Sequence, residues 1–205
     1  MTEPTYEIIE GEQKTDEWQK LREGLITGSV AKKVKGTGNA FLYETLAIML
    51  TGKLPKEARG EDVDRGNELE PEARAEYERA TGRKVRTVAF VRLGRLGLSP
   101  DGLVMEKKRV GRLLEIKSPN VNNHIRYIVE GRIPTEHADQ VIHGFKVMED
   151  VDELDFVSYC PEFPLRPLLI ITARRSDYAV DIATAGVSYD RFLQRLDAAY
   201  LTLIK

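Results

Sequence analysis

The chain has 205 residues, of which 41% are hydrophobic and 31% are charged, a composition typical of soluble globular proteins. Its length predicts one domain over residues 1–205, or one domain with a helical extension. Its single cysteine, Cys160, excludes a disulfide framework, a cysteine-rich zinc site and a cysteine-ligated iron–sulfur cluster. No apolar stretch is long enough to cross a membrane, and residues 1–13 carry no signal pattern, so we expect a cytoplasmic protein.

The net charge of −2, from 31 basic and 33 acidic residues, does not indicate a protein coated in nucleic acid. The charges are nevertheless segregated. Acidic residues crowd 57–72 and 149–155, and basic residues gather at 32–35, 83–86, 92–95 and 107–112. Each basic cluster taken singly is best read as a solvated loop, although together they are compatible with a basic groove beside an acidic metal site. The three histidines lack the spacing of a helical zinc site, so any metal should be oxygen-ligated magnesium or manganese.

Helical periodicity and helix-ending residues predict seven helices. Thr15 can cap the first, with Trp18 and Leu21 buried, and Gly52 ends the third. Pro71 should lie in the first turn of the fourth, where its missing N–H is harmless. The predicted helices are 15–23, 30–34, 40–50, 67–80, 122–130, 135–148 and 187–204, the last with Phe192, Leu193, Leu196, Ala199, Tyr200 and Leu203 on one face.

The middle of the chain changes to the two-residue period of strands, with glycine turns between them. The predicted strands are 85–90, 95–98, 103–106, 112–117, 153–160 and 168–173. The order of elements predicts an α/β (α+β) fold with a helical N-terminal part and a mixed central sheet flanked by helices. No repeat, low-complexity tract or linker divides the chain.

Asp101, Glu115 and Lys117 carry the strongest chemical signal. Successive side chains on a strand point to opposite faces, so Glu115 and Lys117 share one face of the strand 112–117. A hairpin with strand 103–106 would bring Asp101 beside Glu115. Two carboxylates and an ammonium on one patch suit a hard divalent cation and a phosphate ester. The alternative is an ordinary Asp-Gly turn and a solvated strand face, which the apolar run 113–116 disfavours because buried charges are costly unless paired or metal-bound.

Three further features each allow two interpretations. Glu70 either complements the N-terminus of a helix or reaches a cation from it. Arg22 and Ser29 bracket a glycine-rich turn that either caps a helix or holds a phosphate through a guanidinium, hydroxyls and backbone N–H groups. Gln140 is either a surface residue of its helix or positions a water or a base edge.

Taken in order, these segments resemble the family of lambda exonuclease and the YqaJ-type viral recombinase nucleases, which have a PD-(D/E)XK core. The resemblance runs from residue 22 to 141 and extends to Tyr159-Cys160-Pro161 and the C-terminal helix. The segments that carry it are Arg22-x-Gly24-x-Ile26-Thr27-x-Ser29, Gly66-Asn67-x-Leu69-Glu70-x-x-Ala73-Arg74, Ser99-Pro100-Asp101-Gly102, Glu115-Ile116-Lys117-Ser118-Pro119 and Gln140-Val141.

The resemblance implies a role for each of these segments. Asp101, Glu115 and the Ile116 carbonyl would bind metal, with help from Glu70, and Lys117 would orient and activate the attacking water. Separately, the resemblance implies that a terminal 5′-phosphate is bound by Arg22 and Ser29 together with Ser99. The family often shows Gln-x-Gln where this chain has Gln140-Val141-Ile142, so the role of Gln140 is the weakest transfer.

The implied function is a Mg²⁺-dependent 5′→3′ exonuclease on double-stranded DNA ends, with Mn²⁺ as a possible substitute. It would expose 3′ strands for a single-strand annealing protein in phage-type recombination, and the family suggests a homotrimer. One alternative is an endonuclease on the same core, which would nick closed circular DNA. Another is a non-catalytic DNA-end-binding protein, which would have no need for Asp101, Glu115 and Lys117.

Overall fold

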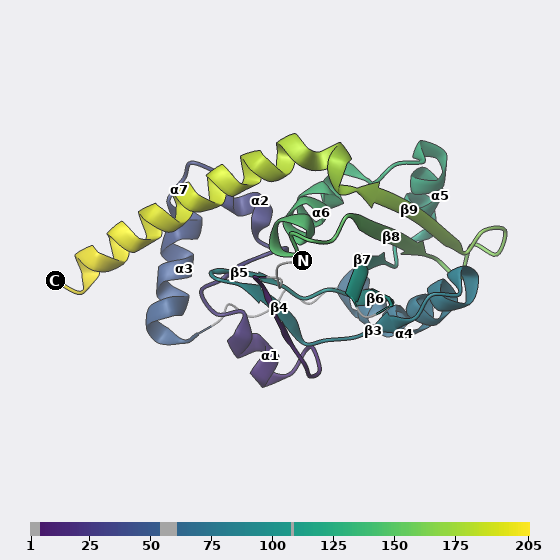
Figure 1. Cartoon of the computed structure of the whole chain (residues 1–205), viewed down its shortest axis with the longest axis horizontal. Helices are drawn as coiled ribbons and strands as arrows, with labels where there is room; N and C mark the ends of the chain where they lie inside the picture. The colour runs from purple at the N-terminus through teal and green to yellow at the C-terminus, as the bar shows by residue number, and fades with distance from the viewer. Residues whose placement is uncertain (1–4, 54–60, 108) are drawn as a thin grey trace.

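Two β-sheets and seven α-helices form the part of the chain described by the computed structural model, residues 5–53, 61–107 and 109–205. Figure 1 shows helices on both sides of the larger sheet and the long C-terminal helix running across the top of the molecule. The strands are β1 (Glu7–Ile9), β2 (Ile26–Thr27), β3 (Val85–Arg86), β4 (Phe90–Leu93), β5 (Leu96–Leu98), β6 (Gly102–Glu106), β7 (Arg109–Lys117), β8 (Glu153–Tyr159) and β9 (Leu168–Arg174). The helices are α1 (Asp16–Leu21), α2 (Ala31–Val34), α3 (Ala40–Thr51), α4 (Glu61–Thr81), α5 (Val121–Glu130), α6 (Thr135–Val147) and α7 (Ala179–Leu203), and a short 3₁₀ helix, Arg175–Tyr178, precedes α7.

The larger sheet has the strand order β3-β6-β7-β8-β9 and is mixed, as predicted: β7 and β8 are parallel and the other neighbours are antiparallel. One face packs against α4 through a buried cluster that includes Tyr77, Leu114 and Val157. The other face carries Leu113 and Phe156 in the main core with residues of α6 and α7. The central strand β7 is therefore covered on both sides, which explains why it has buried apolar residues on both faces, Leu113 on one and Leu114 and Ile116 on the other.

The β6–β7 hairpin predicted from the sequence is present, with Gly102 opposite Leu114. Gly102 is required there because a Cβ atom would lie 2.2 Å from Val85 of β3 and 3.2 Å from Leu114. A side chain at this position would push apart the three strands on which the Asp-Gly turn rests.

The second sheet, β1-β4-β5-β2, was not predicted. The predicted strand 85–90 is wrong in detail: β3 belongs to the large sheet, β4 belongs to the small one, and residues 87–89 connect them. The N-terminal part, predicted to be helical, also contributes β1 and β2. Strands of two and three residues are too short to show a period, and their pairing partners lie far away in the chain, as in Glu7 opposite Arg92.

Two helices start earlier than predicted. α4 begins at Glu61, so Pro71 lies inside the helix and not in its first turn. Because proline has no backbone N–H, the Asn67 carbonyl lacks its usual hydrogen bond from the residue four positions later. Contacts of Arg65 with the Ser118 and Pro119 carbonyls tie the added first turns to the loop after β7. α7 begins at Ala179, directly after the 3₁₀ turn, and Leu203, predicted to face the core, is 61% exposed at its far end.

The predicted helix ends at Thr15 and Gly52 are confirmed. The Thr15 hydroxyl accepts a hydrogen bond from the Trp18 N–H, and Gly52 ends α3 in the left-handed region at φ 63°. Trp18 is buried, whereas Leu21 is only partly buried.

Candidate active site

Asp101, Glu115 and Lys117 come together at the end of the β6–β7 hairpin. An oxygen of Asp101 accepts a hydrogen bond of 2.6 Å from the Ile116 N–H, which fixes this side chain across the hairpin. The Lys117 ammonium lies 2.5 Å from a carboxylate oxygen of Glu115, so the two side chains share one face of β7 as the strand period predicts. Glu115 is only 8% exposed, which makes this a desolvated charge cluster and not a solvated strand face.

The charges in this cluster perturb one another. Burial and, next in importance, the neighbouring Glu115 carboxylate raise the pKa of Asp101 to about 7, partly opposed by the Lys117 ammonium. Burial lowers the pKa of Lys117, but Glu115 and Asp101 outweigh burial and leave that pKa above its usual value. Lys117 is therefore an ammonium that partly neutralises two crowded carboxylates, and the cluster retains negative charge that a cation would stabilise.

The raised pKa of Asp101 predicts that the metal-free protein becomes less stable as the pH rises. The folded state holds the Asp101 proton up to about pH 7, whereas an unfolded aspartate releases it near its ordinary pKa of 3.8. The contribution of this proton to folding stability is therefore fully present below pH 3.8 and is lost as the pH rises from 3.8 to about 7. Chemical denaturation at pH 5 and pH 8 with EDTA should show a loss on the order of 1 kcal/mol or more that Asp101→Asn removes. An unchanged pH dependence in Asp101→Asn would show that this carboxyl does not cause it.

Glu70 reaches the cluster from α4. Its carboxylate accepts a hydrogen bond of 2.6 Å from Arg74 and one of 3.0 Å from Lys14. Arg74 also donates to the Asp101 carbonyl at 3.0 Å, and the Glu70 charge is close enough to raise the pKa of Asp101. Glu70 therefore lies beside the site but is held by two cations, which it would have to exchange for a metal ion.

α4 is fixed to the sheet by a buried carboxylate beneath the site. Asp155 of β8 accepts hydrogen bonds of 2.6 Å from Tyr77 of α4 and 2.6 Å from Thr172 of β9. Arg112 of β7 donates to the same carboxylate at 3.0 Å. These contacts join α4 to three strands and so determine where Glu70 lies relative to β7.

Arg22, Ser29 and Ser99 also come together, although they lie far apart in the sequence. Arg22 donates to the Ser29 hydroxyl at 3.3 Å, and its guanidinium lies 4.2 Å from the centre of the Trp18 ring. The Trp18 indole N–H donates to the Ser99 hydroxyl at 2.9 Å. Ser99 is two residues before Asp101, so this hydroxyl and guanidinium cluster is connected directly to the carboxylate cluster.

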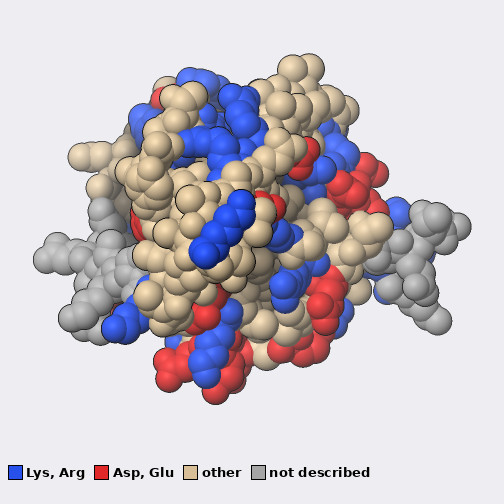
Figure 2. Space-filling model, turned by 90° about the vertical axis from the view of Figure 1, so that its left-hand side faces the viewer, with Lys and Arg blue, Asp and Glu red and all other residues tan. Residues whose placement is uncertain are grey.

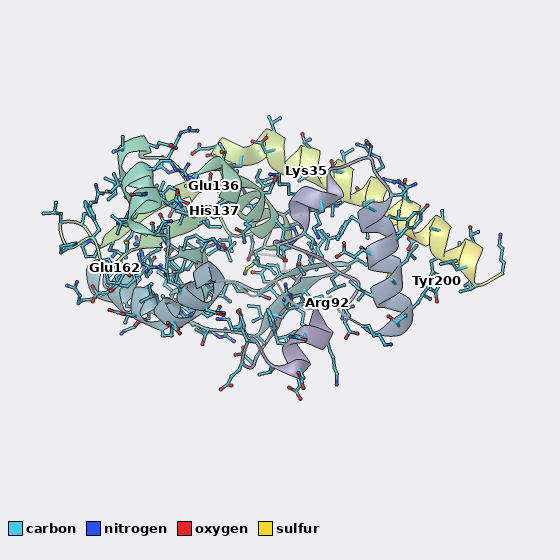
Figure 3. All side chains as sticks on the ribbon, turned by 180° about the vertical axis from the view of Figure 1, so that it is seen from behind. Lys35, Arg92, Glu136, His137, Glu162 and Tyr200 are labelled. Carbon is cyan, nitrogen blue, oxygen red and sulfur yellow. The ribbon has the colours of Figure 1, made fainter. Side chains whose placement is uncertain are left out.

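Gln140 lies on α6, three residues after His137, and its side chain is near enough to that ring to favour the charged imidazolium slightly. Burial lowers the pKa of His137, and the Lys117 charge lowers it further, which places this ring within electrostatic range of the carboxylate cluster. Figure 3 labels His137 beside Glu136 at the start of α6. The His137 ring also hydrogen-bonds the Tyr127 hydroxyl at 3.2 Å, so it has partners within the protein.

Two residues that anchor the backbone near the site, Gln13 and His143, were not predicted from the sequence. The Gln13 amide donates to the Pro100 carbonyl at 2.8 Å and to the Val88 carbonyl at 3.1 Å, which anchors the turn just before Asp101. Fully buried His143 is paired with the Gly97 carbonyl at 2.8 Å and the Tyr189 hydroxyl at 3.1 Å, and burial lowers its pKa to about 4, so it is neutral. Neither residue lies in a recognisable motif, and only the folded chain reveals its partners.

The donor set fits a hard divalent cation. Asp101 and Glu115 offer carboxylate oxygens, and the Ile116 backbone between Glu115 and Lys117 lies against Asp101. Within the described residues, no three histidine, cysteine, aspartate or glutamate side chains are grouped closely enough to hold a metal ion together. The fit therefore rests on two carboxylates, a backbone carbonyl and water, which is how magnesium is commonly held.

Three comparisons place this geometry among known proteins. Residues 17–149 match the family model of the YqaJ-like viral recombinase domain. The solved structure of an alkaline exonuclease (LHK-Exo) from Laribacter hongkongensis has a TM-score of 0.80 and 30% identity, with 92% of this chain and 96% of that chain covered. LHK-Exo in complex with dAMP matches with the same TM-score and coverage and 31% identity. A phage related exonuclease from Haemophilus somnus 129PT, 13% identical with a TM-score of 0.58, covers 87% of this chain and 99% of its own and shares the fold.

No curated protein matches the chain significantly in sequence. The fold and these similarities define a nuclease of the phage recombination type. The chain belongs to the YqaJ-like viral recombinase family, whose exonucleases are in general metal-dependent. No helix in the described part of the chain has both the length and the apolar character needed to span a bilayer.

Proposed function

We propose that this nuclease is a Mg²⁺-dependent 5′→3′ exonuclease that degrades one strand from double-stranded DNA ends and leaves 3′ single strands. The observation that carries the proposal is the desolvated cluster of Asp101, Glu115 and Lys117 on one hairpin. An alkaline exonuclease with 31% identity has been solved with dAMP, a deoxynucleoside monophosphate, which is the class of product that such an enzyme releases.

In this proposal Asp101, Glu115 and the Ile116 carbonyl hold the metal, and Glu70 helps after leaving Arg74 or Lys14. The metal would polarise the scissile phosphate, lower the pKa of a bound water and stabilise the leaving oxygen. Lys117 orients the attacking water and offsets the negative charge that develops on the phosphate. Mn²⁺ can replace Mg²⁺ because it also accepts oxygen ligands. Gln140 supports the site through His137.

The decisive assay compares linear with covalently closed circular DNA, with and without Mg²⁺. Metal-dependent loss of linear DNA and survival of circles supports the proposal. Nicking of circles would replace it with an endonuclease, and no cleavage of either under any divalent cation would contradict it. We also propose a homotrimer and a single-strand annealing protein as partners, which sedimentation of the free protein and co-purification with a candidate annealing protein would test.

The guanidinium and hydroxyl cluster predicts a preference for 5′-phosphorylated ends. Arg22 can grip a phosphate with two parallel charge-assisted hydrogen bonds, and Ser29 and Ser99 add hydroxyl donors. Duplexes with 5′-phosphates should therefore be digested faster than 5′-hydroxyl duplexes. Arg22→Ala should reduce that preference and shorten the run of nucleotides removed per encounter, and Arg22→Lys should restore it only in part because lysine lacks the planar fork.

The measurement is a time course on end-labelled duplexes that carry either terminus, read for rate and polarity. Arg174→Ala, which removes an exposed guanidinium at the end of β9, is the matched control and should leave the preference intact. Equal rates on both termini in the wild type, or loss of nucleotides from the 3′ end first, would refute the phosphate pocket and favour the endonuclease.

A further inference from the structure

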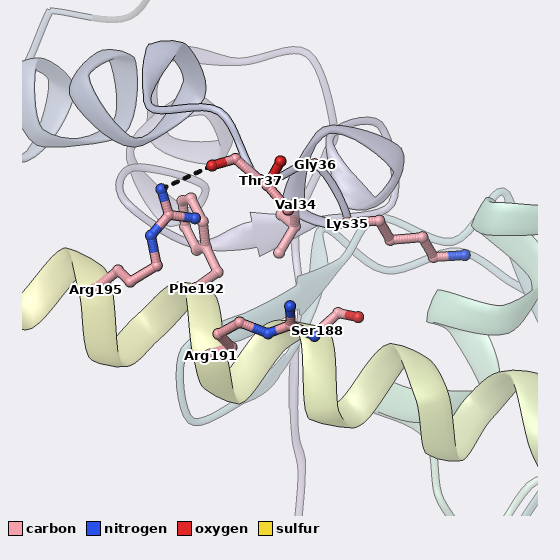
Figure 4. A pocket seen from close by; sticks show the side chains of 8 residues that line it. All are labelled: Val34, Lys35, Gly36, Thr37, Ser188, Arg191, Phe192 and Arg195. Atoms are coloured by element: carbon pink, nitrogen blue, oxygen red, sulfur yellow. Dashed lines mark hydrogen bonds between the residues drawn. The ribbon is translucent and has the colours of Figure 1, made fainter.

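A basic pocket of about 260 Å³ lies between α7 and the segment that joins α2 to α3. Its lining combines cations, hydroxyls and an apolar floor: Val34, Lys35, Gly36, Thr37, Ser188, Arg191, Phe192 and Arg195. In Figure 4, Arg195 reaches across the pocket toward Thr37, whereas Lys35 extends away along α7. Figure 2, which views the end of the molecule bearing α3 and the C-terminus of α7, shows lysine and arginine side chains gathered around a hollow in its upper part.

The two arginines of this pocket differ in how they are held. Arg195 donates to the Thr37 and Gly38 carbonyls, both at 3.3 Å, and to the Asn39 side chain, all through one terminal nitrogen. Its guanidinium is thereby oriented while its other N–H groups face no bonded partner among the described residues. Arg191 is exposed and makes no ion pair or hydrogen bond within the described part of the chain.

Stability does not explain this arrangement. Arg191 and Arg195 are four residues apart on one helix, where like charges repel, and no described carboxylate lies within 4.0 Å of either. Among the described residues, the ion pair found in the pocket joins Lys35 to Asp139 of α6. The chain has 33 acidic and 31 basic residues, so the two arginines do not lack partners because acidic residues are scarce. Two guanidiniums that lack a described carboxylate partner, set around a hollow with hydroxyls, are the chemistry of a phosphate site.

We propose that this pocket binds a backbone phosphate of the DNA duplex, away from the bond that is cleaved. This inference rests on the proposed function. α2 begins two residues after Ser29, so the chain leads directly from the proposed binding site of the 5′-phosphate, at Arg22 and Ser29, to the pocket. A phosphodiester held by Arg191 and Arg195 anchors the duplex while the terminal nucleotide is removed and keeps the shortened strand on the enzyme.

The test is equilibrium binding of a fluorescent 5′-phosphorylated duplex to the full chain in EDTA, where no cleavage occurs, over a range of salt concentrations. Each phosphate contact contributes about 0.9 to the slope of log K against log salt, so Arg191→Gln should lower that slope by about 1 and weaken binding roughly tenfold at low salt. Arg191→Lys should restore the slope and only part of the affinity, because it replaces the charge but not the fork. Arg191 bonds no other described residue, so these variants should fold as the wild type does.

Arg166→Gln is the matched control for loss of one positive charge. Arg166 is an exposed guanidinium in the β8–β9 loop, which lies at the end of the molecule opposite the C-terminus in Figure 1. Figure 3 places Glu162 of the same loop at the end opposite Tyr200 of α7. An equal loss of slope in Arg166→Gln would overturn the proposal, because the effect would then be one of net charge alone.

Two small probes distinguish the sources of the phosphate. Inorganic phosphate and a free 5′-mononucleotide are titrated against wild type and Arg191→Gln in the same buffer. If Arg191→Gln loses mononucleotide binding but keeps the duplex affinity and slope, the pocket is a nucleotide site and the proposal is wrong. Because binding is measured without metal, a loss of slope in Arg191→Gln supports the pocket even if the wild type proves unable to degrade linear DNA, an outcome that would contradict only the proposed exonuclease activity.

Discussion

Asp101→Ala and Glu115→Ala should each abolish cleavage of linear DNA while leaving the fold intact. The two carboxylates are the strongest oxygen donors of the hairpin, and each is desolvated by its neighbours, so its loss removes a ligand that water in a buried site replaces poorly. We expect a fall in rate of at least about 10²-fold, the scale for loss of a preorganised charged group. Both variants should also bind Mg²⁺ or Mn²⁺ more weakly by calorimetry.

The stability of the two metal-free variants at pH 8 tests whether they are folded. Burial and then the Glu115 charge raise the pKa of Asp101, so two ionised carboxylates at pH 8 destabilise the metal-free site. Removing either carboxylate ends their mutual repulsion, so the metal-free variants should be at least as stable as the wild type at pH 8. Glu106→Gln, which alters an exposed carboxylate at the far end of β6, should leave the rate unchanged. Substantial metal-dependent activity in a purified, folded Asp101→Ala or Glu115→Ala protein would sink the proposed site.

Lys117→Ala should cut turnover by a factor on the order of 10² or more while leaving metal binding roughly intact. The ammonium is held 2.5 Å from Glu115 and stays protonated because two carboxylates keep its pKa above the usual value. A positive charge in this position complements a phosphate that gains negative charge during the reaction. Lys117→Met, which keeps the length of the side chain without its charge, should lose turnover to the same extent as Lys117→Ala.

Single-turnover rates at saturating Mg²⁺, together with calorimetric titration of the metal, separate the two possible roles of Lys117. The proposed role requires a slow chemical step at nearly unchanged metal affinity. If Lys117→Ala loses metal binding while the rate per bound metal is unchanged, Lys117 acts by organising Glu115 and not on the reacting phosphate. Restored turnover in Lys117→Arg would show that charge alone is sufficient.

Local sequence determined those features of this protein that depend on neighbours in the chain. The two-residue strand period placed Glu115 and Lys117 on one face, and the short connection between β6 and β7 returned the chain so that Asp101 met Glu115. The Thr15 cap and the Gly52 end follow from hydrogen bonds within a single helical turn. Such contacts involve short loops with little closure entropy, so the residues that specify them lie next to one another in the sequence.

Tertiary structure alone decided the features that join distant segments. The connection at 87–89 sends β3 and β4 to different sheets, and α4 extends past Pro71 because Arg65 bonds the loop after β7. No sequence pattern predicts the hydrogen bond from Gln13 to the Pro100 carbonyl or the one from Trp18 to Ser99. The same is true of the pocket that two arginines of α7 form with the end of α2. Each of these contacts joins residues far apart in the chain, and its free energy depends on burial and desolvation that exist only once the sheets and helices have packed. The proximity of the three proposed catalytic residues could therefore be predicted from the sequence, whereas the framework that holds them and the basic pocket could not.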